Sequence, residues 1–271
     1  MSRASENVIR FFQAKSPEPQ PWGMYHFLCL GVLAALVAAL IAGGRRLRKS
    51  PKTVRRLTAC LGSVLLAAEI LKQIFSSVQI SDGKIIWDYP WHIFPFQLCS
   101  TPLYVCIALF FLPEGRVRRA LCCYLGTFGI VGGAVVMAAP ESVYITSLFI
   151  NVHTMVWHTG LIQLGALQWC GGAIRPDAAD WLGSVVLFLA FATIAFCLDL
   201  FLPQYAAENF NMFYISPHVP PDSSPIFLFV WENVPYPLYL ICYIAGFILL
   251  TGLIFAVLRI PLRRAAKAAA R

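Results

Sequence analysis

Apolar residues fill seven long stretches of this chain, with shorter polar segments between them. The stretches cover residues 24–43, 57–75, 93–112, 120–139, 145–170, 182–202 and 236–257. A helix needs about 20 consecutive apolar residues to cross the hydrocarbon core of a membrane. The pattern therefore predicts an all-α, multi-pass membrane protein in which residues 24–258 form a bundle of seven transmembrane helices. A run of glycines in the fourth stretch predicts close helix packing there.

The distribution of Lys and Arg predicts how this bundle is oriented. Sixteen of the 21 cationic residues fall in the first, third and fifth loops and in the C-terminal tail, and four fall on the opposite side. Loops rich in Lys and Arg stay in the cytoplasm. We therefore expect the N-terminus outside, the C-terminus inside, and the chain in the cell membrane. Because the cations lie at helix ends, the net charge of +8 indicates topology and predicts no nucleic-acid partner.

Three segments are expected outside the hydrocarbon core. Residues 1–23 are polar with one short apolar stretch, which is typical of a segment that lies in the outer interface. The outer loop 203–235 has no Lys or Arg, and residues 259–271 form a basic cytoplasmic tail. Nine Cys are scattered, mostly among apolar residues, and predict no disulfides. The sequence has no evident internal repeat, which weakens a transporter interpretation, and it gives no indication of oligomeric state.

Polar residues inside the predicted helices are the best guide to function, because they are costly in a membrane. At a rise of about 1.5 Å per residue, they gather between the midplane and the outer face. The main ones are Glu69, Lys72, His153, His158 and Asp199. They predict a polar pocket that opens outward or sideways to the outer leaflet. Structural alternatives stay open: Glu69 and Lys72 neutralise each other, each His is a packing residue, and Asp199 is a solvated helix end.

Cys99 differs from the other cysteines in its neighbours. Pro95 lies one turn before it and Pro102 just after it. We expect a helix to begin near Pro95, so that its N-terminal dipole favours a thiolate at Cys99, and we expect Pro102 to open the helix beside the thiol. A nearby His would take the thiol proton, and Gln97 would donate a hydrogen bond to an oxyanion. A kinked packing helix with a buried Cys is the alternative.

Short motifs in the same regions resemble a known family. Residues 94–100 (FPFQLCS) resemble the LPLHLC segment of the YwaF-like bacterial integral membrane proteins, and residues 157–162 (WHTGLI) resemble their SHGLI segment. Glu69 is similar to an acidic residue of that family, and residues 209–213 (NFNMF) are similar to its outer loop before the last helix. The order and spacing of the segments agree from about residue 56 to residue 258.

The resemblance implies a seven-helix fold. It also implies a distant similarity to eukaryotic transmembrane acyltransferases that act on ether phospholipids through a Cys and a His. The Cys matches Cys99 and the His matches His158, with His153 as the alternative because an extra Thr159 interrupts the motif. Gln97 stands where the family motif has His, so the base has to come from the fifth helix or from His92.

These observations lead to a first hypothesis of an enzyme, a Cys–His acyltransferase or acyl hydrolase acting on membrane phospholipid or another amphiphile. Cys99 is its nucleophile, His158 or His153 its base, and Glu69 orients the His. This chemistry requires no cofactor. The two His are five residues apart, which is not a usual metal-ligand spacing, so no metal is expected. The residues expected to contact substrate are Gln97, His92, Lys72, Asn211 and Asp199.

Two further hypotheses compete with the enzyme. The first is a non-catalytic carrier or sensor that responds to protons or a ligand through Glu69 and the intramembrane His residues, as proton relays do. The second is a scaffold whose polar contacts are only structural. A Cys flanked by prolines favours the enzyme, because a carrier does not need it.

Overall fold

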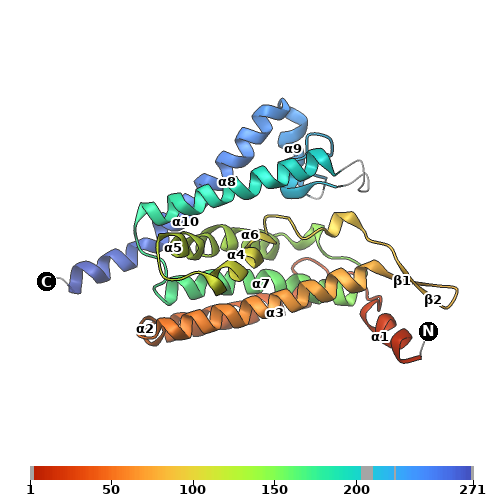
Figure 1. Cartoon of the computed structure of the whole chain (residues 1–271), viewed down its shortest axis with the longest axis horizontal. Helices are drawn as coiled ribbons and strands as arrows, with labels where there is room; N and C mark the ends of the chain where they lie inside the picture. The colour runs from red at the N-terminus through yellow and green to blue at the C-terminus, as the bar shows by residue number, and fades with distance from the viewer. Residues whose placement is uncertain (1–2, 203–209, 223, 270–271) are drawn as a thin grey trace.

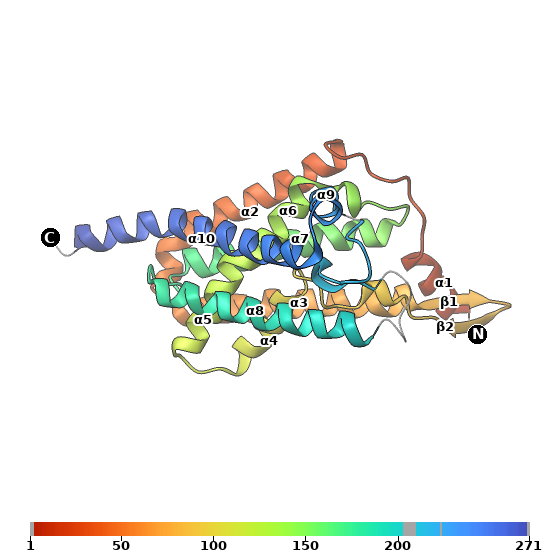
Figure 2. The same ribbon diagram turned by 90° about the horizontal axis from the view of Figure 1, so that it is seen from above.

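The computed structural model describes residues 3–202, 210–222 and 224–269, with side chains described up to residue 260. Most of the chain forms long helices that run along one axis of the molecule, and the two ends of the chain lie at opposite ends of this bundle (Figure 1). The view from above shows the same separation (Figure 2). An odd number of membrane crossings would produce this arrangement.

Five described helices are long and apolar enough to cross a membrane. They are α2 (Met24–Arg48), α3 (Pro51–Ser77), the continuous helix Arg116–Ala138, α8 (Ala178–Phe201) and the part Tyr236–Ile260 of α10 (Tyr236–Ala269). The prediction of a multi-pass, helical membrane protein is confirmed. Seven crossings, and the compartment that each end faces, stay predictions.

Two of the seven predicted segments are not among these five helices. Segment 93–112 contains only the short helix α4 (Thr101–Phe111), whose length of about 16 Å covers roughly half of the hydrocarbon core. The chain reaches α4 through a hairpin of β1 (Val78–Ser81) and β2 (Lys84–Trp87), a 3-10 turn η1 (Trp91–Ile93) and an irregular stretch, 94–100. Segment 145–170 contains α7 (Leu148–Cys170), a continuous helix that is long enough to cross a membrane. Polar residues interrupt its apolar sequence.

Helix α7 is the centre of the bundle. Fourteen of its 23 residues are buried, and it packs against α2, α3 and α6 (Ile130–Ala138). Glycines make this packing possible, as predicted for the fourth segment. A Cβ atom on Gly133 would lie 2.6 Å from the carbonyl oxygen of His158, so only glycine lets α6 approach α7 this closely. The polar residues of α7 are therefore enclosed by protein instead of lipid.

The fourth predicted helix contains a π-helical turn. Leu125–Gly129 form this turn between α5 (Arg116–Tyr124) and α6. The indole N–H of Trp169 donates to the carbonyl of Gly126 at 2.8 Å, which satisfies one carbonyl at the irregularity. A Cβ atom on Gly129 would lie 3.7 Å from Pro102 Cγ, so the turn lies against the start of α4. Such π turns often lie at functional sites.

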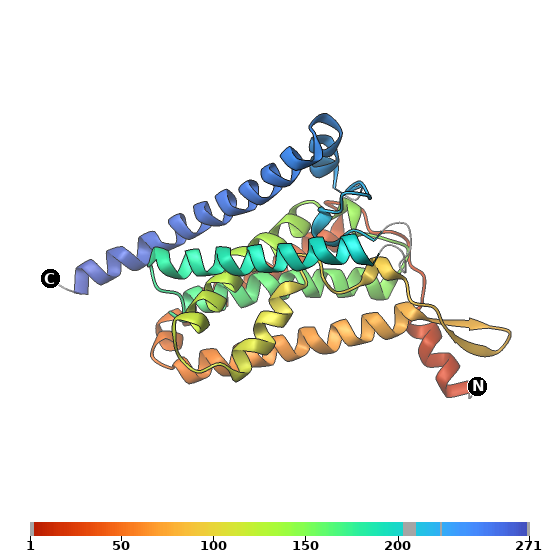
Figure 3. The same ribbon diagram turned by 45° about the horizontal axis from the view of Figure 1, so that its top comes forward.

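The remaining elements close the end of the bundle opposite the Arg-rich loops. Helix α1 (Arg3–Phe12) packs there, where Phe12 stacks on Phe75 of α3 with ring centroids 3.8 Å apart. Figure 3 shows α10 beside α8 at one edge, with α9 (Pro225–Asn233) at its N-terminal end. Two 3-10 turns, η3 (Pro140–Ser142) and η4 (Met212–Tyr214), complete the fold. Most of the basic tail, including Arg263 and Lys267, lies outside the described side chains.

Candidate functional site

Cys99 lies at the break in the third segment, just before α4. Ser100 is the N-cap residue and the helix begins at Thr101, so the expectation of a helix from Pro95 is wrong. Pro102 occupies the second helical position, where a backbone N–H has no partner within the helix. Proline therefore starts α4 here. The prediction that Pro102 opens a continuous helix beside the thiol is wrong. The thiol still lies near a helix N-terminus, which favours negative charge.

Side chains from neighbouring helices satisfy the backbone of the irregular stretch. Gln73 donates to the carbonyl of Ile93 at 2.9 Å, and the hydroxyl of Tyr104 donates to that of Pro95 at 2.6 Å. The indole N–H of Trp157 donates to the carbonyl of Cys99 at 3.0 Å. Irregular backbone persists at membrane depth only where protein or a cavity satisfies its polar groups. These bonds hold Cys99 in place.

The same contacts bring both His residues of α7 to the neighbourhood of Cys99. The ring of Trp157 stacks on that of His153 with centroids 5.5 Å apart, and His158 follows Trp157 in the chain. Helix α6 gives a second link. A Cβ atom on Gly132 would lie 3.5 Å from Cys99 Cα, while the adjacent Gly133 faces the carbonyl of His158. The backbone of Cys99 therefore contacts Trp157 of α7 and Gly132 of α6, which are the neighbours in sequence of His158 and Gly133.

The hydrogen bond of His158 determines its tautomer. Its Nδ1 lies 2.7 Å from the carbonyl oxygen of Thr154. A carbonyl oxygen only accepts, so Nδ1 carries the proton and Nε2 keeps its lone pair. Nε2 is buried and has no hydrogen-bond partner among the described residues. His158 is thus a neutral imidazole whose free lone pair can accept a proton.

Glu69 is the centre of a separate charged network. Its carboxylate lies 2.8 Å from the ammonium of Lys72 and 3.8 Å from Nε2 of His153, and it accepts a hydrogen bond of 2.6 Å from Gln73. The ion pair expected from the three-residue spacing is therefore present. Glu69 faces His153 and not His158, whose tautomer depends on a backbone carbonyl.

Tyr89 extends this network toward the outer hairpin. Its hydroxyl donates to Oε1 of Gln73 at 2.8 Å. Burial, with a smaller contribution from Glu69, raises the pKa of Tyr89 to about 12, so the hydroxyl stays protonated and remains a donor. Neither Tyr89 nor Gln73 was predicted as a site residue, although Gln73 is one of the polar residues of the second predicted helix, because neither belongs to a recognisable motif.

Two residues expected to contact substrate, Gln97 and Asp199, hold the outer segment 210–216, which contains a third, Asn211. Gln97 donates to the carbonyl of Asn211 at 2.7 Å and accepts from the N–H of Phe213 at 2.8 Å. Asp199 accepts from the N–H of Met212 at 2.6 Å. Asp199 is fully buried, so it is not a solvated helix end, and its other oxygen has no partner among the described residues.

The segment 210–216 enters the bundle. Phe213 is fully buried although its φ of 57° is rare for a residue with a side chain, and the tertiary contacts impose this strain. Asn211 accepts from the N–H of Ser216 within the segment and donates to the carbonyl of Val219 just after it. His92 is exposed on η1. Residues 203–209, including Asn209 of the predicted motif, lie outside the described residues.

An apolar groove of 420 Å³ runs along α7 beside this site. Thr159 and Gly160, which follow His158, line it together with residues of α2 and α3. Leu36, Leu61 and Gln163 connect it to a second groove of 480 Å³ closer to the Arg-rich end. Cys99 does not line either groove. Gln163, whose buried side-chain nitrogen has no partner among the described residues, is a polar residue that the sequence analysis missed.

The site offers nucleophile and base chemistry. Within the described residues, no cluster of three or more His, Cys, Asp or Glu is arranged to hold a metal ion, and all nine cysteines are free.

Comparison with known proteins identifies the family. Residues 21–255 match the model of the TMEM164 family, so the chain belongs to this family of multi-pass membrane proteins. No curated protein and no solved structure matches the chain. The finer resemblance to YwaF-like proteins, and the relation to acyltransferases, stay predictions.

Proposed function

We propose that this member of the TMEM164 family is a membrane-embedded Cys–His acyltransferase or acyl hydrolase whose substrate is a phospholipid or another amphiphile. The observation that carries the proposal is the hydrogen bond between the backbone of Cys99 and Trp157 of α7. Cys99 lies at a break in the third segment, near a helix N-terminus, and its carbonyl accepts a hydrogen bond from Trp157, which stacks on His153 and directly precedes His158. Nucleophile and base side chains from different helices are brought together in this way in Cys–His enzymes.

The proposed reaction has two balanced steps. Nε2 of His158 takes the proton of the Cys99 thiol, and the thiolate sulfur attacks the carbonyl carbon of an acyl ester. The ester C–O bond breaks, the leaving alcohol receives the proton from His158, and the acyl group remains on sulfur as a thioester. The hydroxyl of a lysolipid or a water molecule then gives its proton to His158 and attacks the thioester, which restores the thiol.

The hydrogen bond of Nδ1 favours His158 over His153 as the base, because it fixes the tautomer of His158 with the lone pair on Nε2. Nε2 of His153 is likewise buried without a hydrogen-bond partner among the described residues, but it lies 3.8 Å from the carboxylate of Glu69. In this proposal Glu69, Lys72 and His153 influence the reacting groups electrostatically and do not transfer protons. The reaction requires the Cys99 sulfur within hydrogen-bond reach of His158 Nε2, about 3 Å, in the substrate complex.

The lateral groove supports an amphiphilic substrate. An acyl chain in this groove contacts the apolar residues of α2 and α3 and reaches Thr159 and Gly160, next to His158. Its volume of 420 Å³ lies in the usual range for ligand pockets. Access from the side of the bundle also suits a lipid that never leaves the membrane.

The proposal includes the topology. We place the chain in the cell membrane with seven crossings, counting α7 and the pair formed by residues 94–100 and α4. The N-terminus then lies outside, and the Arg-rich end and residues 259–271 lie in the cytoplasm. A broken third crossing is acceptable because protein side chains satisfy its backbone.

The charged network favours one alternative function, a carrier or sensor that responds to protons or a ligand. Glu69, Lys72 and His153 form a contiguous chain of ionisable groups inside the bundle. In that function Glu69 is essential and Cys99 is dispensable.

The test uses purified protein in proteoliposomes that contain a phospholipid with a fluorescent acyl chain. We expect a labelled protein band that hydroxylamine removes, as a thioester requires. The band should disappear in Cys99→Ser and persist in the matched control Cys60→Ser, which alters an exposed thiol. A band and lipid turnover that survive Cys99→Ser would exclude the nucleophile. Loss of a pH-dependent response in Glu69→Gln with an unaffected Cys99→Ser would favour the carrier instead.

A further inference from the structure

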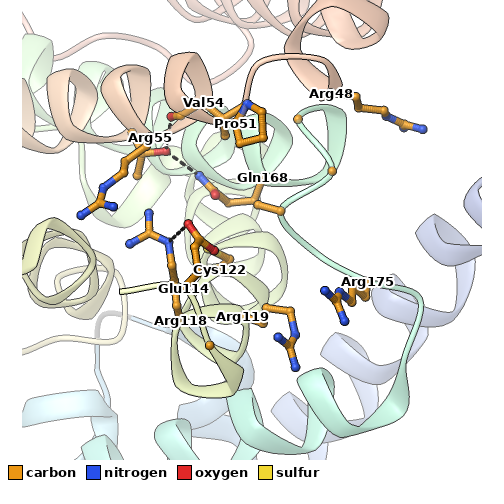
Figure 4. Close-up of a pocket in the computed structure, with 15 residues that line it drawn as sticks. Arg48, Pro51, Val54, Arg55, Glu114, Arg118, Arg119, Cys122, Gln168 and Arg175 are labelled. Carbon is orange, nitrogen blue, oxygen red and sulfur yellow. Dashed lines mark hydrogen bonds and ion pairs between the residues drawn. The ribbon is translucent and has the colours of Figure 1, made fainter. Parts of the chain in front are cut away.

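A polar cavity lies at the Arg-rich end of the bundle, away from Cys99. Its volume is 440 Å³, and it is enclosed by the end of α2, the start of α3, the start of α5 and the loop between α7 and α8 (Figure 4). Five arginines from these four segments line it. They are Arg48, Arg55, Arg118, Arg119 and Arg175.

Positive charge is in excess around this cavity. Arg118 is paired with Glu114 and Arg119 with Asp180, each at 3.2 Å. Among the described residues, Arg48 and Arg55 donate to backbone carbonyls, those of Cys170 and Phe110, and to no carboxylate. Those carbonyls carry no net charge, and Arg175 is exposed with no carboxylate partner among the described residues. Three guanidinium groups are therefore left without a counter-charge of the described chain.

The cavity continues into an apolar groove between α3 and α4. An adjoining space of 310 Å³ shares Arg55, Thr58 and Arg118 with the cavity. A further groove of 190 Å³ shares Ala59, Cys106 and Phe110 with that space. A ligand that fills all three has an anionic head at the arginines and an apolar chain along α3 and α4.

We propose that this cavity binds the phosphate head group of an anionic phospholipid, with one acyl chain in the groove between α3 and α4. Guanidinium groups bind phosphate oxygens through paired, charge-assisted hydrogen bonds. Basic pockets between helices at the cytoplasmic side of a membrane bind anionic head groups in this way. The apolar groove argues for a lipid over a soluble phosphate. The site is separate from Cys99 and does not depend on the proposed enzyme activity.

The positive-inside rule alone does not produce this arrangement. That rule requires cations in the loops but does not require them to surround a cavity. Arg45, Lys49 and Arg116 belong to the same loops and line none of the cavities described above. They provide a control with the same loss of charge.

The experiment measures the melting temperature of the purified protein in detergent micelles. Micelles contain increasing fractions of palmitoyl-oleoyl phosphatidylglycerol, with phosphatidylcholine as the zwitterionic lipid and inorganic phosphate as the soluble anion. A ligand that binds only the folded state raises the melting temperature by an amount set by the ratio of its concentration to Kd, so the titration yields a Kd. The first variant combines Arg48→Gln, Arg55→Gln and Arg175→Gln. The control combines Arg45→Gln, Lys49→Gln and Arg116→Gln.

We expect phosphatidylglycerol to stabilise the wild type more than phosphatidylcholine does. The first variant should raise the Kd at least tenfold, and the control should change it less than twofold. Ala59→Phe, which fills the start of the groove, should weaken phosphatidylglycerol binding without changing the response to inorganic phosphate. Arg175→Gln alone removes an exposed side chain, so it keeps the test informative if the triple variant unfolds, and it should raise the Kd about threefold.

Two results would overturn the proposal. Equal effects of the two triple variants would mean that the arginines act only as general surface charge. Stabilisation by inorganic phosphate that equals that by phosphatidylglycerol, with no effect of Ala59→Phe on either, would assign the site to a soluble phosphate compound.

Discussion

The two ends of the bundle differ in whether their charged side chains are paired. Near Cys99, Glu69 and Lys72 pair with each other, and backbone carbonyls are bonded to side chains of neighbouring helices. At the Arg-rich end, guanidinium groups outnumber carboxylates and surround an open cavity. The difference shows that charges within the membrane need partners from the protein, whereas charges at the head-group level can stay available for a ligand.

The largest effect is expected from substitutions of the two His residues of α7, at the end of the bundle where Glu69 and Lys72 pair. His158→Ala should lower lipid turnover by about 10²–10⁴-fold, the usual contribution of a general base. His153→Gln, which keeps a polar side chain beside Glu69, should lower it less. Turnover of the fluorescent lipid by each variant measures the order, with melting temperature as the control for folding. The reverse order would assign the base to His153 and remove the argument from the tautomer of His158.

Breaking the charge pair should have the next largest effect. Glu69→Gln leaves the ammonium of Lys72 without its partner at 2.8 Å, and removing one partner of a buried pair typically costs about 3–5 kcal/mol. The free energy of unfolding in mixed micelles measures this loss. The double variant Glu69→Gln, Lys72→Met should recover most of it, because no unpaired charge remains. If the double variant is as unstable as the single one, the pair is not what stabilises this end.

A smaller effect is expected at the outer segment. Asp199→Ala removes the acceptor of the Met212 N–H, and an unsatisfied buried donor costs about 1–3 kcal/mol. Asp199→Asn keeps a carbonyl oxygen in the same place and should preserve most of the stability. Limited proteolysis near residues 210–216 reports local release of the segment. Equal stability of the Ala variant and the wild type would contradict a structural role for this carboxylate.

The smallest effect distinguishes the two interpretations of Pro102. If this proline opened a continuous helix, Pro102→Ala would straighten the segment and disturb Cys99. The structure puts it in the first turn of α4, so we expect a change in stability of about 1 kcal/mol or less and unchanged labelling of Cys99. Thermal unfolding and thiol labelling of this variant measure both quantities.

The long apolar stretches predicted most of the helices correctly but did not predict the structure of the third segment. Residues 93–112 are apolar enough to predict one crossing, yet Pro95 and Pro102 and the bonds from Tyr104 and Trp157 produce an irregular stretch followed by a short helix. Those bonds come from side chains up to 58 residues away. A pattern within one window cannot contain them.

The candidate site was likewise predicted only in part. Polarity within the predicted helices pointed to Glu69, His153, His158 and Asp199, because each is costly in a membrane. It did not show that Glu69 faces His153, or that Asp199 and Gln97 hold the outer segment. Depth along a helix follows from the rise per residue, but the partner of a side chain depends on how helices rotate and pack against each other.

The sequence by itself determined the membrane class, most of the helices and the clustering of cations in particular loops, since these follow from local hydropathy and charge. Only the tertiary structure decided that α7 is central, that α4 begins after Cys99 and that five arginines surround one cavity. Each of these depends on contacts between residues far apart in the chain. Close approach at Gly132 and Gly133, and hydrogen bonds from neighbouring helices, are the physical reasons that hold Cys99 against α6 and α7.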